Sequence, residues 1–325
     1  MGEKFQSISV ANVNKPLSKL VFGTALKLMT EGGDANQLLD QVMAMGVNVF
    51  DTAADYGDSE ASLGNWVTAR ENRNKIVVIT KGANTSRWRR RLTVHDIVSD
   101  FMTSLAKLQT DYVDIYFLHR DDPTVSVGPI VEQLNDLYLQ GKVRAYGGSN
   151  WTVDRIEQAN EYAYKHDLQP FTVSSPSYSL AEMIADPCGD SVTLSGDKNS
   201  TARDWYQKNQ MPVFAYSCLG RGFFSGKLKS DFTGKAEELI GLGGLEYGFP
   251  VNFERLRRVE ILAEKYGKSV SQIALAWLVA QPLNLLPITS TGTISHLKDS
   301  IEAMKLQLSE QECLWLNLQT ESLDV

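Results

Sequence analysis

The chain has 325 residues, of which 43% are hydrophobic, and carries a formal net charge of −7 from 32 basic and 39 acidic residues. This length lies within the range of one α/β barrel with insertions, so we expect a single domain over residues 1–325. The acidic balance, without a basic stripe, argues against nucleic acid as a partner. The start of the chain lacks the apolar run of a signal peptide and no window approaches the length of a membrane span, so we expect a cytoplasmic protein without membrane contact.

Short apolar runs alternate along the chain with longer segments whose apolar residues recur every three or four positions. This is the pattern of strands alternating with amphipathic helices. In chain order, the short runs predict strands at 20–23, 47–51, 76–80, 113–119, 143–149, 171–175, 212–217 and 285–288. The longer segments predict helices at 35–46, 59–68, 93–107, 127–140, 152–165, 200–209, 253–280 (two helices broken near Gly267) and 294–303.

Start and stop signals support several of these helices. Ser59, Thr93 and Thr152 are expected to cap helix starts, because their side-chain oxygens can accept the free amides of the first turn. Gly46 and Gly141 stand where two helices should end. Residues 1–16 are expected to form a hairpin at the opposite end of the fold from the active site, and 305–325 a C-terminal helix and tail, the helix over 309–319.

Eight nearly continuous apolar strands, each followed by a helix, favour a closed (β/α)8 TIM barrel, because parallel strands buried on both faces read as apolar runs. An open doubly wound sheet is the alternative. Two segments, 181–200 and 225–252, interrupt the repeat after strands. We expect both to be extra loops at the C-terminal mouth of the barrel.

Four ionisable side chains follow three consecutive predicted strands. Asp51 ends the second strand, with Tyr56 five residues beyond it in DTAADYG; Lys81 ends the third strand and His119 the fourth. The C-terminal ends of barrel strands face one mouth, and burying such groups is costly unless they pair with one another or with a ligand. Each residue alone has an ordinary structural explanation, but their convergence predicts a catalytic site.

These four residues suit the reduction of a carbonyl group, which needs a hydride at carbon and a proton at oxygen. Tyr56 is the candidate acid, and Lys81 should lower its pKa by favouring the phenolate. Asp51 would hold Lys81 charged and oriented. His119 would donate a second hydrogen bond to the carbonyl oxygen.

The motifs FDTAADYGDSEASLG, IVVITKG, YFLHRDDP, GGSNWT, AYSCLGRGFFSGKL and PITSTGTISHLKDSIEA together resemble, in order, those of the aldo-keto reductase superfamily, from about residue 18 to about 305. That resemblance implies a (β/α)8 barrel that binds NADP(H), or less often NAD(H), in extended form without a Rossmann domain. No predicted strand is followed by G-x-G-x-x-G, in agreement with this. The resemblance also implies that Tyr56 is the acid/base, supported by Asp51, Lys81 and His119.

The resemblance further implies a set of cofactor-binding residues. Ser149 and Asn150 would hold the nicotinamide carboxamide, and Tyr216 would stack on the nicotinamide ring. The turn with Ser217, Leu219 and Gly220 would wrap the pyrophosphate, and Ser290 and Thr291 would bind the adenosine end. The full set implied is Gly23, Thr24, Asp51, Ser149, Asn150, Ser175, Tyr216, Ser217, Leu219, Gly220, Ser290, Thr291, Thr293, Asp299 and Ser300.

Three positions depart from the family pattern. Ser175 stands where Gln is usual, and Ser300 where Asn is common. The segment after Pro287 usually carries a Lys or Arg for the 2′-phosphate of NADP, whereas Gly292 and Thr293 occupy it here and no Lys or Arg lies within 289–297. NADP(H) is expected from the family, and the missing cation makes NAD(H) an open alternative.

The expected function is NAD(P)H-dependent reduction of an aldehyde or ketone, or oxidation of the corresponding alcohol, on a small carbonyl or sugar-like substrate. Two alternatives remain open: a nucleotide-binding regulatory protein with weakened catalysis, and a barrel hydrolase using carboxylates among Asp51, Asp55, Asp121 and Asp122. The arginines near Trp88 suggest either a pocket for an anionic substrate or an exposed basic loop, and the latter is favoured slightly. Cys188, Cys218 and Cys313 lack a C-x-x-C and predict neither a disulfide nor a metal site. The sequence does not decide the oligomeric state.

Overall fold

The computed structural model describes residues 7–323 of the chain. Eight parallel strands close a barrel in the order β10-β3-β4-β5-β6-β7-β8-β9. Their bounds are β3 Val21–Gly23, β4 Val49–Asp51, β5 Val77–Gly82, β6 Val113–Leu118, β7 Val143–Ser149, β8 Val173–Ser175, β9 Val213–Ala215 and β10 Leu285–Thr289. The expected TIM barrel is confirmed, and the doubly wound sheet is wrong because a closed ring has no edge strands.

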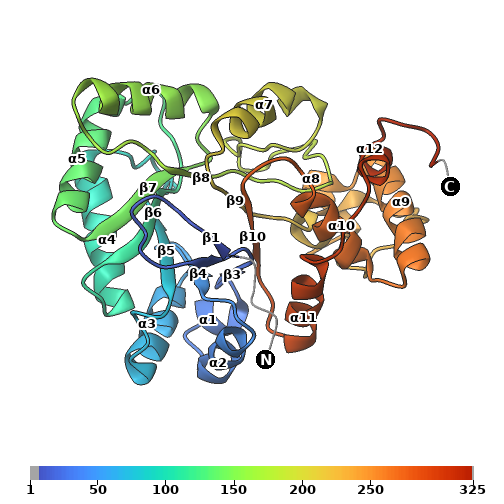
Figure 1. Cartoon of the computed structure of the whole chain (residues 1–325), viewed down its shortest axis with the longest axis horizontal. Coiled ribbons are helices and arrows are strands. Elements are labelled where there is room, and N and C mark those ends of the chain that lie inside the picture. Colours follow the sequence, from blue (N-terminus) through green and yellow to red (C-terminus); the bar gives the residue numbers. More distant parts are fainter. Residues whose placement is uncertain (1–6, 324–325) are drawn as a thin grey trace. The chain divides into compact units, whose positions relative to one another are not determined.

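Helices separate the strands in the predicted order (Figure 1). The α-helices are α1 Lys27–Thr30, α2 Asn36–Ala44, α3 Ser59–Arg70, α4 Val94–Leu108, α5 Val127–Leu139, α6 Val153–Lys165, α7 Ser200–Asn209, α8 Gly244–Tyr247, α9 Pro250–Tyr266, α10 Val270–Val279, α11 Ile294–Ala303 and α12 Glu310–Leu316. Short 3₁₀ turns lie at η1 Asp197–Asn199, η2 Gly220–Gly222 and η3 Ala236–Glu238. In Figure 1, α3 to α6 lie on the outer side of the strands that they connect.

The helix ends follow the predicted signals with one exception. Thr93 and Thr152 each accept a hydrogen bond from the backbone amide three residues later, and α9 and α10 are separated at Gly267, which has a φ of 60°. The prediction of Ser59 as a cap is wrong. Ser59 is the first residue of α3, and its hydroxyl donates to the side chain and backbone of Thr24 instead, because the loop after β3 offers buried acceptors.

The chain divides into two compact units. The first comprises the chain up to Ser175 with 211–214 and 290–294, and the second comprises 176–210, 215–289 and the C-terminal part from Ser295. All four predicted catalytic residues belong to the first unit. The expectation of a single domain stays a prediction.

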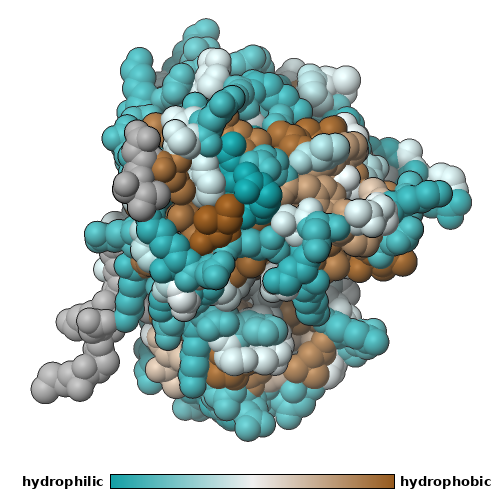
Figure 2. Space-filling model, turned by 90° about the vertical axis from the view of Figure 1, so that its right-hand side faces the viewer, coloured by the Kyte–Doolittle hydropathy of each residue, from teal (hydrophilic) through white to brown (hydrophobic). Residues whose placement is uncertain are grey.

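The surface of the protein mixes polar and apolar side chains, as Figure 2 shows for one face on which separate apolar areas lie among hydrophilic ones. In the second unit the large apolar side chains with most exposure include Ile240 and Leu245. Within residues 7–323, no helix combines the length and hydrophobicity needed to cross a lipid bilayer.

A hairpin and a charge cluster lie at the N-terminal ends of strands in the first unit. Strand β1 (Ser7–Ile8) pairs antiparallel with β2 (Leu17–Ser18), so the hairpin ends later than the predicted 1–16, and residues 1–6 lie outside the described part. The Lys15 ammonium donates to the backbone oxygen of Ile76 just before β5, and it lies 2.7 Å from a carboxylate oxygen of Asp114 near the start of β6. The hairpin therefore contacts the barrel end opposite the predicted active site.

Asp114 is expected to be a stability residue. Its side chain is buried, pairs with Lys15 and with Arg73 at 2.7 Å each, and accepts the backbone amide of Val78. Replacing Asp114 by asparagine leaves two partly buried cations without a counter-charge, so the free energy of unfolding should fall by about 3 kcal/mol in urea denaturation. Exposed Asp111→Asn is the matched control and should change it by less than about 0.5 kcal/mol. Equal stability of the two variants would contradict the assignment.

Candidate functional site

Asp51 and Lys81 form a buried ion pair at the C-terminal ends of β4 and β5. The Lys81 Nζ lies 2.7 Å from each carboxylate oxygen of Asp51 and also donates to the backbone oxygen of Thr52 at 3.0 Å. Burial alone would lower the pKa of Lys81, but attraction from Asp51, Tyr56 and Asp55 outweighs it and raises that pKa. Burial raises the pKa of Asp51 against the pull of Lys81. We take the pair as ammonium and carboxylate at neutral pH, because each Asp51 oxygen accepts a charge-assisted hydrogen bond.

Tyr56 lies in the loop between β4 and α3, next to this pair. The Lys81 Nζ is 5.0 Å from the centre of the Tyr56 ring. Lys81 has the predicted lowering effect on the pKa of Tyr56, but the net shift of that pKa is upward. Burial raises the pKa, and Asp51 and Asp55 oppose the lowering effect of Lys81, so that the phenol keeps its proton at neutral pH. The prediction included the effect of Lys81 on the phenol, but not the effects of burial and of the two carboxylates.

His119 follows β6 directly and lies beside Tyr56, with ring centres 5.9 Å apart. Its Nδ1 lies 3.0 Å from a carboxylate oxygen of Asp55, although the ring N–H direction is not aligned with that oxygen. The other Asp55 oxygen accepts a hydrogen bond from the Asn84 side chain at 2.5 Å. Burial lowers the pKa of His119 despite Asp55, whereas the contact with His119 outweighs burial and lowers the pKa of Asp55.

The contact of Asp55 with His119 was not predicted, and neither was the role of Asn84. Asp55 was named only as one of several acids, and Asn84 was not singled out. The sequence signal that could have identified these two residues is their position after predicted strands. Asn84 follows Lys81 by three residues after β5, which neighbours the strand of His119, and Asp55 precedes Tyr56 in the loop after β4, the next strand along the barrel.

Gly23 and Thr24, at the end of β3, support the Asp51 backbone. Gly23 pairs with Asp51 in the sheet register, and both the amide and the hydroxyl of Thr24 donate to the Asp51 backbone oxygen, at 2.8 Å and 3.0 Å. These contacts hold the end of β4, where Asp51 turns towards Lys81. Any cofactor contact of Gly23 and Thr24 stays a prediction.

Ser149 and Asn150 place buried polar groups at the end of β7. Ser149 donates to the backbone oxygen of Ser175, its register partner in β8, and Asn150 donates to the backbone oxygen of His119 at 3.2 Å. The Ser175 hydroxyl donates to the backbone oxygen of Phe214, so its hydrogen is already used in a bond within the barrel. The amide and hydroxyl chemistry next to His119 fits a carboxamide such as that of nicotinamide.

In the second unit, the segment after β9 contains Tyr216, Ser217, Leu219 and Gly220. Ser217, Gly220, Arg221 and Gly222 have φ between 53° and 99°. Left-handed residues in succession turn backbone amides towards one side, which suits an anion such as a pyrophosphate. The role of this segment in cofactor binding stays a prediction.

The segment between β10 and α11 carries the remaining predicted cofactor residues. Ser290, Thr291 and Thr293 lie in this connection, with Thr291 donating to the Thr293 backbone oxygen. Asp299 and Ser300 lie within α11, and Ser300 donates to the backbone oxygen of His296 in its own helix. A Cβ added at Gly292 would meet no atom within 4 Å, so this connection has room for a larger side chain.

The arginines of the loop after β5 form ion pairs and hydrogen bonds with residues of the first unit. Arg89 and Arg91 pair with Asp96 and Asp100 of α4, at 2.6 Å and 2.5 Å, and Arg90 donates to the backbone oxygen of Asp121. Trp88 is 84% exposed. These contacts favour the exposed basic loop over the pocket for an anionic substrate.

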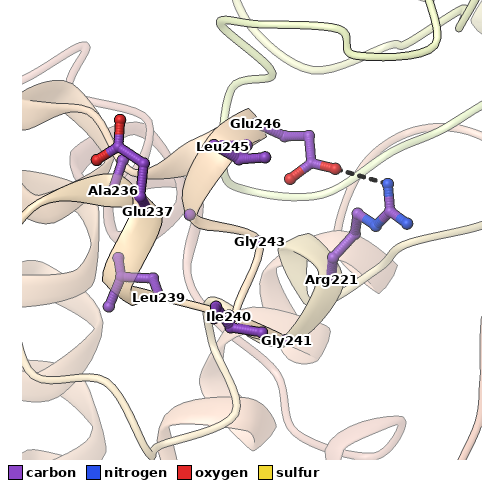
Figure 3. A pocket seen from close by; sticks show the side chains of 10 residues that line it. Arg221, Ala236, Glu237, Leu239, Ile240, Gly241, Gly243, Leu245 and Glu246 are labelled. Atoms are coloured by element: carbon purple, nitrogen blue, oxygen red, sulfur yellow. Dashed lines mark hydrogen bonds and ion pairs between the residues drawn. The ribbon is translucent and has the colours of Figure 1, made fainter.

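A pocket of about 350 Å³ lies in the second unit. It is lined by Arg221, Ala236, Glu237, Leu239, Ile240, Gly241, Gly243, Gly244, Leu245 and Glu246. Figure 3 shows Arg221 and Glu246 pointing towards each other at its border, 2.6 Å apart. Apart from Arg221, its lining residues belong to the predicted loop segment 225–252, and none of the predicted catalytic side chains lines it.

The carboxylates proposed for a hydrolase each have another partner. Asp51 pairs with Lys81, Asp121 pairs with Arg155 at 2.9 Å, and Asp122 accepts from Thr124. Among residues 7–323, no group of three or more His, Cys, Asp or Glu side chains is arranged to hold a metal ion.

The comparison with known proteins identifies the family of the chain. The model of the aldo/keto reductase family matches residues 19–315. The chain belongs to the aldo/keto reductase family. As a member of the aldo/keto reductases, it is an NAD(P)-dependent oxidoreductase, so the hydrolase alternative falls away.

Relatives are similar to the chain in sequence, and a solved structure is similar to it in fold. It is 30% identical to norsolorinic acid reductase B of Aspergillus parasiticus, over 90% of this chain and 74% of that protein. It is 29% identical to an aryl-alcohol dehydrogenase [NADP(+)] of Phanerodontia chrysosporium, over 86% and 74% of the two chains. The fold is similar to that of the thermostable aldo-keto reductase Tm1743, with a TM-score of 0.71 at 22% identity, covering 97% of this chain and 100% of that one.

Proposed function

We propose that the chain reduces an aldehyde or ketone with NAD(P)H, and oxidises the corresponding alcohol in reverse, with Tyr56 as the proton donor. The observation that carries this proposal is the buried Lys81 ammonium, held by both oxygens of Asp51 and lying 5.0 Å from the Tyr56 ring. Burying this ion pair costs desolvation free energy. A role of the Lys81 ammonium in proton transfer at Tyr56 explains why the pair is buried beside the phenol.

A nicotinamide dinucleotide, when bound, would provide the hydride for the carbonyl carbon. The Tyr56 hydroxyl donates its proton to the carbonyl oxygen, and the Lys81 ammonium stabilises the phenolate that remains. Asp51 keeps Lys81 charged and directed at Tyr56, and solvent returns the proton to Tyr56. His119 lies beside Tyr56 and orients the substrate. Ser149 and Asn150 would hold the nicotinamide carboxamide.

Cofactor titration tests this proposal. Fluorescence titration with NADPH and NADH, followed by aldehyde-dependent oxidation of the cofactor, should show binding and turnover. The panel should include aryl aldehydes, because the relatives include an aryl-alcohol dehydrogenase, and sugar-like hydroxyaldehydes. Binding of neither dinucleotide, by a protein with an intact circular dichroism spectrum, would overturn the proposal.

The preference between NADP(H) and NAD(H) depends on the connection before α11. NADP(H) is proposed from the family, with weak discrimination against NAD(H) because residues 289–297 contain no cation. Gly292→Lys should tighten NADPH binding about tenfold through a charge-assisted contact with the 2′-phosphate and leave NADH binding unchanged. The open space around Gly292 makes the substitution sterically possible.

Gly292→Ala is the matched control for this substitution, because it changes the backbone freedom without adding charge. The affinities for both dinucleotides, measured by fluorescence, should stay at the native values in this variant. An equal gain for NADPH and NADH in Gly292→Lys would show that position 292 does not face the 2′-phosphate.

A further inference from the structure

Ser59, at the start of α3, joins two loops that follow barrel strands. Its hydroxyl lies 2.9 Å from the backbone oxygen and 2.7 Å from the hydroxyl of Thr24, directly after β3, and donates to that residue. It also accepts a hydrogen bond from the hydroxyl of Thr52, directly after β4, at 3.2 Å. Ser59, Thr24 and Thr52 are each 0% exposed. Because water cannot replace these bonds, the three hydroxyl groups depend on one another for their partners.

The same hydroxyl groups hold the peptide bond between Asp51 and Thr52. The backbone oxygen of Asp51 accepts from both the amide and the hydroxyl of Thr24. On the other side of this peptide, the Thr52 amide donates to the backbone oxygen of Ile79 in β5 at 2.9 Å. Since Ser59 also binds the Thr52 side chain, the direction of the next backbone oxygen, that of Thr52, is fixed.

The Lys81 ammonium depends on this peptide for its position. An ammonium group has three hydrogens to donate. Three acceptors match them, namely the two carboxylate oxygens of Asp51, at 2.7 Å each, and the backbone oxygen of Thr52, at 3.0 Å. These acceptors belong to two consecutive residues, so a shift of the peptide that joins them moves the ammonium as well.

Ser59 also binds the backbone of Tyr56. Its amide donates to the Tyr56 backbone oxygen at 3.0 Å, and the chain turns between the two residues at Gly57, which has a φ of 57°. Through its amide Ser59 therefore contacts the residue that carries the phenol, and through its hydroxyl it contacts the residues that position the Lys81 ammonium. The separation of 5.0 Å between that ammonium and the phenol ring depends on both contacts.

We propose that Ser59 is a positioning residue that fixes Tyr56 relative to the Lys81 ammonium. Its effect on the reaction rests on the proposed reductase function, in which the ammonium stabilises the phenolate left after proton donation. An ammonium that is less well held stabilises the phenolate less, because the attraction between opposite charges decreases with distance. Ser59→Ala should therefore lower kcat for aldehyde reduction about 10- to 100-fold. The KM and the affinity for NADPH should stay near the native values.

The pH profile of alcohol oxidation distinguishes positioning from a loss of folded protein. Oxidation needs the phenolate as base, so its rate should rise with pH, and Ser59→Ala should move the midpoint of this rise to higher pH. A smaller folded fraction would lower the rate without moving the midpoint. Ser59→Ala replaces none of the charged or titratable groups around Tyr56, so a shift of the midpoint reports a change in their positions. These groups are Lys81, Asp51, Asp55 and His119.

Ser62→Ala is the matched control. Ser62 is 7% exposed and lies on the same helix, and its hydroxyl donates to the backbone oxygen of Met29 at 3.1 Å. This variant also loses one buried hydroxyl bond, but the bond does not involve residues 51 or 52. It should keep the native kcat and the native midpoint.

A double variant separates stability from positioning. Ser59→Ala leaves the Thr52 hydroxyl buried without a partner, which lowers stability. Adding Thr52→Val removes that hydroxyl, so the unfolding temperature should return towards the native value. The loss in kcat and the shift of the midpoint should remain, because the bond from Ser59 to Thr24 is still missing. Recovery of the native kcat together with stability would show that Ser59 serves only the fold.

Nitrogen NMR of the lysine ammonium groups tests the positioning without turnover. The Lys81 signal is identified by its absence from Lys81→Met. Hydrogen exchange of this ammonium should be about tenfold faster in Ser59→Ala, the effect of one weakened hydrogen bond, and unchanged in Ser62→Ala. Native exchange in Ser59→Ala, or a lower kcat with an unmoved midpoint, overturns the role of Ser59.

The same measurement separates this proposal from the proposed function. A native protein that binds neither dinucleotide and reduces no aldehyde overturns the reductase function. Faster exchange of the Lys81 ammonium in Ser59→Ala would still support the placement of this group by Ser59, and native exchange would still exclude it.

Discussion

Tyr56→Phe is expected to lower kcat/KM for carbonyl reduction by about 10²- to 10⁴-fold, because it removes the proton donor and nothing else. The Tyr56 pKa is raised by burial, so the native phenol is protonated throughout the neutral range and ready to donate. The phenylalanine ring fills the same space beside His119, so dinucleotide affinity and unfolding temperature should stay near the native values. Initial rates of cofactor oxidation, with fluorescence titration of NADPH, measure both quantities.

Tyr164→Phe is the control for the loss of a hydroxyl group. Tyr164 is 67% exposed and lies on α6, so this variant should keep the native rate.

The raised pKa of Tyr56 also predicts how the rates of the two reaction directions depend on pH. Reduction should show no loss from ionisation of this residue between about pH 6 and 9, whereas alcohol oxidation, which needs the phenolate as base, should increase with pH. A Tyr56→Phe variant that keeps more than about a tenth of native activity would remove Tyr56 from the role of proton donor.

Lys81→Met is expected to abolish most activity and to lower the free energy of unfolding by about 3 to 5 kcal/mol, because it leaves the Asp51 carboxylate buried without a counter-charge. The two side chains are each less than 5% exposed, so solvent cannot replace the lost partner. Without Lys81, the pKa of Asp51 should be raised further. A carboxyl group whose pKa is raised by folding binds protons more tightly in the folded state, so the variant should lose stability as pH rises above the unfolded value of Asp51.

Double replacement separates stability from catalysis. Lys81→Met combined with Asp51→Leu removes both charges, and apolar side chains commonly replace a buried ion pair without loss of stability. We expect the double variant to regain much of the lost unfolding free energy in urea denaturation while remaining inactive. Recovery of activity together with stability would show that the pair serves only the fold.

The strand and helix pattern was predictable because it depends on local properties. Each barrel strand is short, apolar and buried on both faces, and each connecting helix has its own apolar stripe, so strands and helices can be recognised from windows of about ten residues. Thr93 and Thr152 cap helices as predicted, since capping depends on contacts within one turn. Ser59 does not, because its hydroxyl donates to Thr24, which directly follows β3 and is distant in the chain.

The sequence by itself also determined the type of chemistry, since Asp51, Lys81 and His119 lie at or directly after strand ends and Tyr56 follows in the next loop. Parallel strands in a barrel bring their C-terminal ends to one mouth whatever the details of packing.

Only the tertiary structure decided which of the neighbouring charges act on each group. The Tyr56 pKa depends on burial and on two carboxylates as well as Lys81, and His119 contacts Asp55 across two loops. These effects depend on distances of a few ångströms between segments that are far apart in the chain, and no local pattern encodes such distances.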